Sequence, residues 1–321
     1  MRRSILKTYP TYRSIAISTP RVQQQRVPAR RKIPNLFAYG TVSVAVLFFT
    51  VFYYYPFLMN LYYMFTNYSY IGDYQFIGLK NITRFFQDPS IRVVFSNTFI
   101  LTIATVPIAL ILALFVAIAV FYMTIGKALI RSAIFSTTLV TGVVAAIIFK
   151  LWFSQELGYI DNILESLHFA RIPWLTDTTW ALTAIVIVGV WSGLGYNMVI
   201  YLAGLANVSK ELLDASRVDG ANATQRFYYV MIPQLKPTIL FLSITLVIGA
   251  LKTYAPVAIL TEGGPYGSTR TALLYMFQKG FDSRNVGYGS VIAFALFIII
   301  LIITLVQMKA TRFYAEDSNK R

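Results

Sequence analysis

The sequence predicts an all-α integral membrane protein with six transmembrane helices and both termini in the cytoplasm. Of its 321 residues, 57% are hydrophobic and only 13% are charged, and the mean hydropathy is +0.61. The charged fraction is about half that of a typical soluble domain. Several apolar runs are long enough, at roughly 20 residues, to cross a hydrocarbon core about 30 Å thick as helices. A water-soluble fold has no way to hide them.

The order of the apolar runs and of the charges sets the expected topology. We expect spans at residues 35–57, 95–122, 132–153, 180–205, 238–260 and 288–309. If the N-terminus is inside, the inner segments hold 19 Lys or Arg residues, whereas the outer loops hold seven. Those outer loops are residues 58–94, 154–179 and 261–287. The positive-inside rule therefore predicts an N-in, C-in orientation.

Three parts are expected along the chain: a basic cytoplasmic arm at 1–34, a six-helix transmembrane domain at 35–310, and a cytoplasmic tail at 311–321. The first 32 residues hold nine Lys or Arg and no acidic residue. They lack the apolar core and cleavage site of a removable signal peptide. Contact with anionic lipid or control of topology suits such an arm. Nucleic acid is not an expected partner, because the arm offers few aromatic residues for stacking on bases.

Several kinds of chemistry are disfavoured by composition. The absence of cysteine excludes disulfides and Cys-based metal or nucleophile chemistry. The single histidine, His168, lies in an outer loop without a carboxylate cluster, and we interpret it as a surface residue. We therefore expect no metal site, no cofactor and no catalytic residue. No Walker A sequence is present, since Gly126-Lys127 is followed by Ala128 and lacks the upstream glycine that cradles phosphates. Any ATPase must be a separate polypeptide.

A soluble-looking insert runs from Lys210 to Pro233 between two long apolar runs. Its sequence predicts a short helix, a break at Asp219-Gly220, and a second short helix that ends at Pro233. Ser209 is the expected cap of the first helix and Asn222 of the second. The expected product is a compact knob suited to a partner's groove. The alternative is an ordinary cytoplasmic loop with incidental helicity.

The insert carries a motif: Asp214-Ala215-Ser216, three residues, Gly220, nine residues, Val230, one residue, and Ile232-Pro233. It resembles the EAA loop of permease subunits of bacterial binding-protein-dependent ABC importers, with Asp for Glu, Ser for the second Ala and Ile for Leu. The resemblance implies that the insert is the coupling helix, seated in a groove of an ATPase. The ATPase-coupling residues that it implies are Asp214, Ala215, Ser216, Asp219, Gly220, Ala221, Ile232 and Pro233.

The resemblance covers roughly residues 35–310 and is to the maltose-type, carbohydrate branch. Its further features are Gly158 with Asn162, Pro173-Trp174-Leu175, Trp191, Leu202-Ala203-Gly204-Leu205, and Thr261 with Gly263-Gly264-Pro265. It implies the type I ABC importer permease fold in a bacterial cytoplasmic membrane. The implied partners are a second permease subunit in a heterodimer, two ATPase subunits, an extracytoplasmic substrate-binding protein, membrane lipid, and a sugar or related polyol as substrate.

The resemblance also implies substrate contacts at Ser192, Gly193, Tyr196 and Asn197 in the fourth span and at Thr253 in the fifth. Lys252 is a further candidate because of its position in the fifth span. Aromatic faces with hydroxyl and amide groups are usual in pockets for hydroxylated ligands. Helix packing is the alternative for Gly189 and Gly193, spaced as G-x-x-x-G. Lys252 either borders the cavity or snorkels to the outer interface, because an unpaired lysine at the bilayer centre costs about 2.5–3.5 kcal/mol. Tyr288 is interpreted as an interfacial anchor.

Three other functions are alternatives to a sugar permease. A glycerol-phosphate permease stays open, because Lys252 and Arg270 offer positive charge to an anion. A secondary transporter usually has repeats and ionisable midplane residues, whereas this chain has no acidic residue in any expected span. A membrane enzyme requires a cluster of nucleophile, base or metal ligands, which the sequence lacks.

Overall fold

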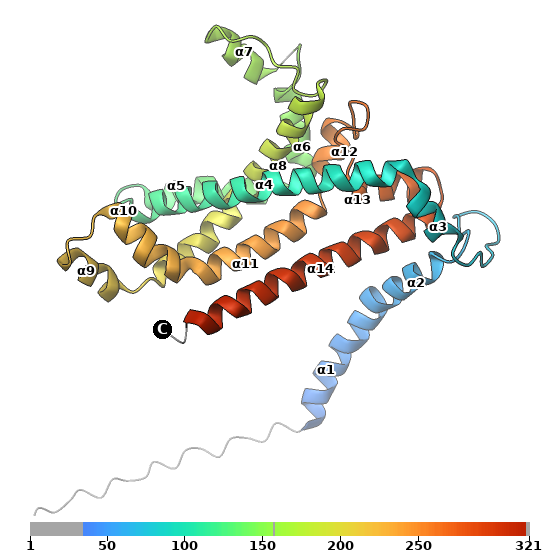
Figure 1. Ribbon diagram of the computed structural model, residues 1–321, viewed down its shortest axis with the longest axis horizontal. Coiled ribbons are helices and arrows are strands. Elements are labelled where there is room, and N and C mark those ends of the chain that lie inside the picture. Colours follow the sequence, from blue (N-terminus) through green and yellow to red (C-terminus); the bar gives the residue numbers. More distant parts are fainter. Residues whose placement is uncertain (1–34, 157, 319–321) are drawn as a thin grey trace, which may run out of the picture. The chain divides into compact units, whose positions relative to one another are not determined.

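The computed structural model describes residues 35–156 and 158–318, with side chains at 39–156 and 158–310, and its regular structure is helical (Figure 1). The predicted basic arm and the last residues of the tail lie outside the described residues. The α-helices are α1 Asn35–Phe49, α2 Tyr55–Tyr63, α3 Lys80–Gln87, α4 Pro89–Tyr122, α5 Lys127–Phe135, α6 Gly142–Trp152, α7 Tyr159–Ser166, α8 Thr178–Ala206, α9 Lys210–Val218, α10 Ala223–Arg226, α11 Ile232–Leu251, α12 Ala255–Leu260, α13 Ala272–Phe277 and α14 Val286–Ser318. Three π-helical turns (η1 Thr50–Tyr54, η3 Phe227–Met231, η4 Gln278–Asp282) and one 3₁₀ turn (η2 Ser136–Leu139) join some of them.

The described residues divide into two units, with the boundary between Tyr54 and Tyr55. The described part of the first unit is α1 with η1, and its side chains from Tyr39 onward are exposed. The hydroxyls of Ser43 and Thr50 donate to carbonyl oxygens one turn earlier, those of Tyr39 and Val46. These polar side chains are therefore satisfied within the apolar helix itself.

Membrane-length apolar helices match five of the six expected spans. They are Tyr39–Tyr63, Pro89–Tyr122, Thr178–Ala206, Ala223–Leu260 and Val286–Ala310. The remaining expected span is the third, over residues 132–153. It consists of two helical pieces, Lys127–Leu139 and Gly142–Trp152, with an angle of 98° between them. The prediction of a single straight third span is therefore wrong, although the pair together is apolar enough to be counted as one.

Hydroxyl side chains and extended backbone account for the bend. Ser136 and Thr137 donate to the carbonyls of Ala133 and Ile134, which competes with regular helical bonding as α5 ends in the 3₁₀ turn. Val140 and Thr141 are then extended, with ψ of 121° and 149°. The Thr141 hydroxyl accepts from the Val144 N–H at 3.4 Å and caps α6. A new helix thus begins in a new direction.

The inner core of the second unit joins α4, α8 and α11, which lie side by side (Figure 1). Small residues on α4 allow close approach to large side chains from the other helices. The buried residues of this inner core are Ala113, Ala117, Val120, Met198, Tyr201, Leu205, Val208, Met231, Leu235 and Leu242. This cluster anchors the base of the segment that carries α9 and α10.

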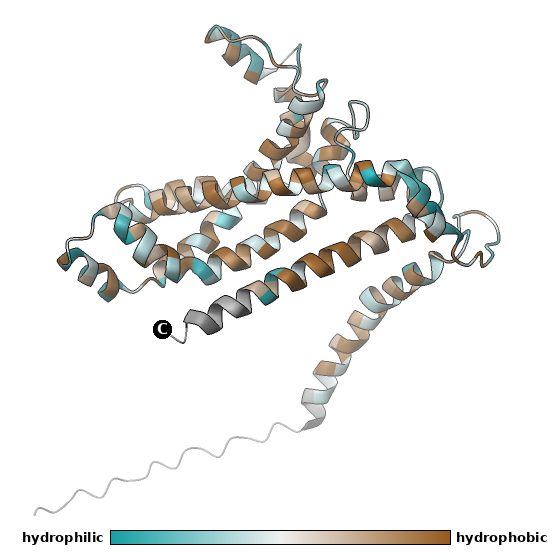
Figure 2. Ribbon diagram, in the orientation of Figure 1, coloured by the Kyte–Doolittle hydropathy of each residue, from teal (hydrophilic) through white to brown (hydrophobic). Residues whose placement is uncertain are grey.

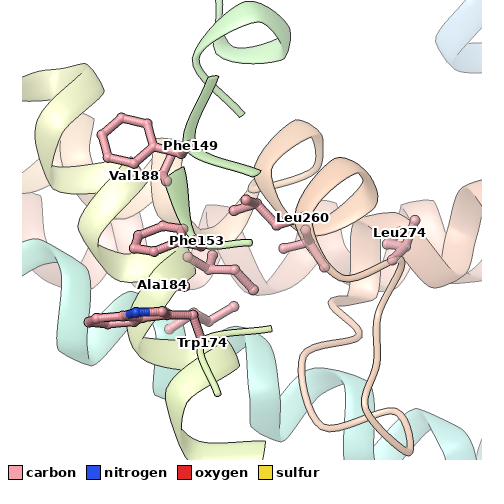
Figure 3. Packing of buried hydrophobic residues seen from close by; sticks show 10 residues of the cluster. Phe149, Phe153, Trp174, Ala184, Val188, Leu260 and Leu274 are labelled. Atoms are coloured by element: carbon pink, nitrogen blue, oxygen red, sulfur yellow. The ribbon is translucent and has the colours of Figure 1, made fainter. Parts of the chain in front are cut away.

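The outer core is richer in aromatic residues. Phe149 and Phe153 of the α6 segment stack near Trp174, whose ring centroid is 5.0 Å from that of Phe153 (Figure 3). Ala184 and Val188 of α8, Val257 and Leu260 of α12, and Leu274 of α13 complete the packing. The bent third segment is therefore held in place by apolar contacts to three other elements.

A third cluster corrects the interpretation of Tyr288. This residue is fully buried with Val94, Ala272, Tyr275, Ile292 and Leu296. Its hydroxyl donates to Asp88 at 2.7 Å. Tyr288 is therefore a core residue that joins α14 to the start of α4, and not an interfacial anchor.

Hydropathy along the ribbon follows the expected division of the chain. Figure 2 shows hydrophobic residues along α4, α8, α11 and α14, and hydrophilic residues on α3 and at α9 and α10. The soluble-looking insert thus forms one end of the long helices.

Candidate functional site

The first helix of the insert, α9, begins at the predicted cap. The Ser209 hydroxyl accepts from the Leu212 N–H at 3.3 Å, and the Ser209 N–H donates to Gln234 Oε1 at 2.9 Å. Leu213 packs on the inner core, whereas Leu212 is 54% exposed and Val218 is 88% exposed. One face of α9 is therefore fixed to the membrane helices, and the other faces outward with apolar side chains available to a partner.

The turn after α9 is a Schellman motif. The Ala221 N–H donates to the Ser216 carbonyl at 2.9 Å and the Gly220 N–H to the Arg217 carbonyl at 3.1 Å. Gly220 has φ of +77°, and a Cβ built on it meets nothing within 4 Å. Glycine suits this position because of its backbone conformation and not because of crowding, since a left-handed φ costs glycine little. Space around Gly220 remains open for a partner.

The second helix begins with a complete capping box. Asn222 Oδ1 accepts from the Gln225 N–H and Gln225 Oε1 accepts from the Asn222 N–H, both at 2.8 Å. Arg226 Nη1 donates to the Ala221 carbonyl at 2.9 Å, which ties this helix back to the turn. Both predicted caps are thus present, and the hairpin's local bonds hold it in one conformation.

Pro233 does not end the second helix, contrary to prediction. The helical segment runs on from Ala223 through η3 into α11. At the π-helical turn the Ile232 N–H donates to the carbonyl of Phe227, five residues back. Pro233 follows directly on this turn, where the shifted bonding register accommodates a residue without an N–H inside the helix. The second helix of the insert is therefore continuous with α11.

A surface cavity of about 340 Å³ lies at the hairpin. Four of the expected coupling residues line it: Ser216, Asp219, Gly220 and Ala221. The remaining lining residues, Gln225, Arg226, Tyr229 and Val230, come from the second helix. Gln225 could have been found from its place three residues after a capping asparagine; no local pattern singled out Arg226 or Tyr229.

The other expected coupling residues lie apart from that cavity lining. Asp214 forms an exposed ion pair with Arg217 at 2.8 Å, and a pair of this kind contributes little to stability. Ala215 is exposed on α9, and its carbonyl accepts from the Asp219 N–H. Ile232 and Pro233 lie at the start of α11.

On α8, the expected substrate residues divide between two environments. Ser192 and Tyr196 are four residues apart and share a helix face, and Tyr196 is 44% exposed. Asn197 is buried at 2% exposure, and its amide nitrogen has no hydrogen-bond partner among the residues that the structure describes. A Cβ on Gly193 would lie 3.1 Å from that nitrogen, whereas one on Gly189 would lie 3.3 Å from Thr105 of α4. Interhelical packing thus accounts for Gly189.

In the fifth span, Lys252 and Thr253 lie at a break in the helix. α11 ends at Leu251, and α12 begins at Ala255. Lys252 is exposed, and the Thr253 carbonyl accepts from the Thr271 hydroxyl at 3.0 Å. Lys252 therefore sits at a helix end and not within an unbroken helix, as the expected span of 238–260 had placed it.

The outer loop around α7 brings together two features noted in the sequence. A Cβ on Gly158 would collide with the Ser154 carbonyl, so only glycine fits. Buried Asp161 accepts from Trp174 Nε1 at 3.0 Å and from the Ile172 N–H at 3.3 Å. The loop is thus a structural support. His168 is exposed, as expected.

An all-helical chain with membrane-length apolar helices and a rigid soluble hairpin between two of them defines a multi-pass membrane protein. The chain belongs to the family of binding-protein-dependent transport system inner membrane components, whose model matches residues 89–310. It is therefore a transport subunit of the cytoplasmic membrane. The predicted membership of the permeases of binding-protein-dependent importers is thereby confirmed.

Curated relatives align over most of their length. The chain is 33% identical to the lactose transport system permease protein LacF of Rhizobium radiobacter, over 84% of this chain and 92% of that protein. It is 32% identical to the probable ABC transporter permease protein YesP of Bacillus subtilis, and the alignment covers 89% of this chain and 94% of YesP. The arabinooligosaccharides transport system permease protein AraP of Bacillus subtilis is 30% identical to this chain. That alignment covers 88% of this chain and 89% of AraP.

A solved structure shows the same fold. A chain of a bacterial ABC transporter involved in the import of the acidic polysaccharide alginate superposes with a TM-score of 0.78 at 17% identity. The match covers 87% of this chain and 96% of that one. The predicted type I ABC importer permease fold is therefore confirmed.

Proposed function

We propose that this chain is one of two permease subunits of an ATP-driven importer for oligosaccharides, disaccharides or related polyols. The named substrates of relatives at 30–33% identity, lactose and arabinooligosaccharides, support the sugar assignment. The second permease subunit, two ATPase subunits and an extracytoplasmic substrate-binding protein complete the machine. The chain itself catalyses no covalent step.

The observation that carries this proposal is the hairpin of α9 and α10. A Schellman turn and a capping box fix its shape without help from a partner. It presents exposed Val218 and Leu212 beside the 340 Å³ cavity, a combination suited to insertion into a groove. Because the second hairpin helix continues into α11, movement of a docked ATPase reaches the membrane helices through rigid structure.

Substrate passes, in this proposal, along the face of α8 that carries Ser192 and Tyr196. Gly193 and Asn197 line the same stretch, and Lys252 with Thr253 borders it from the end of α11. The exposure of Tyr196 supports this placement, and one turn earlier the buried Ser192 hydroxyl has no hydrogen-bond partner among the described residues. The basic arm 1–34, the hairpin segment 206–237 and the tail 311–321 lie on the cytoplasmic side.

Two substitutions at Gly220 test the coupling role, because they differ in whether the new residue tolerates the left-handed backbone conformation. In the reconstituted complex, Gly220→Val should abolish both ATPase copurification and stimulation by substrate-loaded binding protein, because a β-branched residue strongly disfavours φ of +77°. Gly220→Asn is the matched variant, since asparagine tolerates the left-handed region, and it should retain ATPase binding. If Gly220→Val transports sugar and keeps its ATPases like the parent, the coupling role is wrong.

A further inference from the structure

A second surface cavity, of about 370 Å³, lies where the start of α4 meets α13 and η4. Its lining residues are Arg84, Gln87, Asp88, Pro89, Ser90, Tyr275 and Lys279. All of them belong to the predicted outer loops 58–94 and 261–287. None lies on α8 or α11, where the proposed substrate contacts are, so the cavity is separate from the proposed path of the sugar.

The one carboxylate in the cavity lining, that of Asp88, accepts hydrogen bonds from other groups of the same chain. Asp88 Oδ2 accepts from the hydroxyls of Tyr275 at 2.6 Å and Tyr288 at 2.7 Å. Its Oδ1 accepts from the Ser90 N–H at 2.9 Å and caps α4. Asp88 is therefore a structural anion that holds three elements together.

The two cations of the cavity lack a comparable partner. The Arg84 guanidinium lies 4.3 Å from the ring centroid of Tyr288, and Lys279 Nζ lies 5.2 Å from that of Tyr275. Within the described side chains, neither cation forms an ion pair. A cation over an aromatic face keeps N–H donors free for a carboxylate, and arginine presents them as a planar fork.

Both cations are held in place by backbone structure. Arg84 is in the last turn of α3, where its carbonyl accepts from the Asp88 N–H at 2.9 Å. Lys279 is on the π-helical turn η4, and its carbonyl accepts from the Asn285 N–H at 2.9 Å. Fixed backbone and a ring contact for each cation restrict where the two charges lie in the cavity lining, which lowers the entropy cost of binding an anion.

We propose that Arg84 and Lys279 form a docking site for an acidic side chain of the extracytoplasmic substrate-binding protein. This inference rests on the proposed function, because it names a contact surface for one of its partners. Charge favours this occupant: the outer loops 58–94 and 261–287 together hold six Lys or Arg and four Asp or Glu, and Asp88 is consumed internally. Complementary charges of this kind steer association and fix the register of two proteins.

The experiment uses the full complex in nanodiscs and the binding protein that supports its sugar uptake. Binding kinetics are measured for the parent, for Arg84→Glu with Lys279→Glu, and for Lys80→Glu with Arg284→Glu. The second pair is the matched control, because it reverses two outer charges that do not line the cavity. We expect the cavity pair to raise Kd at least about tenfold, mainly through faster dissociation, and the control pair to change it less than about threefold, mainly through slower association.

A second, milder variant shows whether weaker binding comes from lost charge or from misfolding of the charge-reversed protein. Arg84→Gln with Lys279→Gln removes the charges without reversing them and should raise Kd about fivefold, with unchanged melting temperature and basal ATP hydrolysis. Equal Kd values for the parent and this variant, or equal losses for the cavity and control pairs, overturn the proposal. A parent complex that takes up no sugar contradicts the proposed function instead, so the two failures are distinct.

Galacturonate, a small anionic sugar, tests whether the cavity of Arg84 and Lys279 binds a small anion instead of a protein side chain. It is titrated into the parent complex without binding protein and into the Arg84→Gln, Lys279→Gln variant. No binding to the parent at millimolar concentration supports the docking site. Binding that the variant abolishes makes the cavity a site for an anionic sugar and overturns the proposal.

Discussion

The Tyr288 hydroxyl donates to Asp88 Oδ2 at 2.7 Å across 200 residues of sequence. This bond joins the start of α14 to the cap of α4, and Tyr275 of α13 donates to the same oxygen. One carboxylate thus sets the relative position of three elements on the outer side.

Removal of the Tyr288 hydroxyl should destabilise the fold. We expect Tyr288→Phe to lower the free energy of unfolding by about 1.5–3 kcal/mol, because a buried hydrogen bond to a charged group is lost. Unfolding in mild detergent, followed by tryptophan fluorescence, measures the change. Tyr266→Phe is the control, since Tyr266 is fully exposed and should behave like the parent.

Acid should weaken the fold through Asp88. Burial of its carboxyl disfavours ionisation, but donors from Tyr275, Tyr288 and Ser90 outweigh burial and lower the pKa of Asp88 from 3.8 to about 2. The stabilisation is fully present above pH 3.8 and is lost as pH falls from 3.8 toward 2, because the unfolded state protonates first. Melting temperatures across this window should fall less steeply for Asp88→Asn than for the parent. Asp282→Asn, at an exposed aspartate, should keep the parent's slope; equal slopes for all three proteins contradict the prediction.

Gly287 should not tolerate a side chain. A Cβ there would collide with the Thr66 carbonyl and lie 2.9 Å from Asn81 Nδ2, which donates to the carbonyls of Met64 and Thr66. We expect Gly287→Ala to cost about 1–3 kcal/mol through overpacking. Gly249→Ala is the matched control, because a Cβ at Gly249 meets nothing within 4 Å. The same yield and melting temperature for both variants would show that the close packing around Gly287 is not required.

Tyr196 should affect transport without affecting assembly. Tyr196→Ala is expected to reduce sugar uptake severalfold and leave basal ATP hydrolysis intact, because the aromatic face available to a sugar ring is lost. Tyr196→Phe should retain most uptake. Phe115→Ala, which also removes an exposed aromatic ring from a span, is the control. Unchanged uptake in both Tyr196→Ala and Thr253→Ala would assign these residues to packing.

Single cysteines can test the orientation, because the parent has none. Tyr266 and Val218 are 102% and 88% exposed on opposite sides of the predicted membrane. In intact cells an impermeant thiol reagent should label Tyr266→Cys and not Val218→Cys; after permeabilisation it should label both. The reverse pattern would invert the predicted topology.

Features set by neighbouring residues could be predicted from the sequence. The lengths of apolar runs located five of the membrane helices, because the hydrophobic effect acts on each residue in proportion to its area. Ser209 and Asn222 were recognised as caps, and Gly220 as the turn glycine, because capping and φ preferences depend on residues within one helical turn. The hairpin therefore follows almost entirely from local sequence.

Features that depend on distant contacts were decided only by the tertiary structure. Local hydroxyl groups mark where the third span breaks, but the direction that α6 takes after Val140-Thr141 is set by its packing against α8 and α12. Pro233 lies within a continuous helix because a π-helical turn shifts the bonding register before it. The position of Tyr288 at the start of the last span is typical of an interfacial tyrosine, but its hydroxyl bonds to Asp88 in the folded chain. Residue spacing encodes local hydrogen bonds and burial, whereas the partner of a buried polar group 200 residues away depends on how the helices pack.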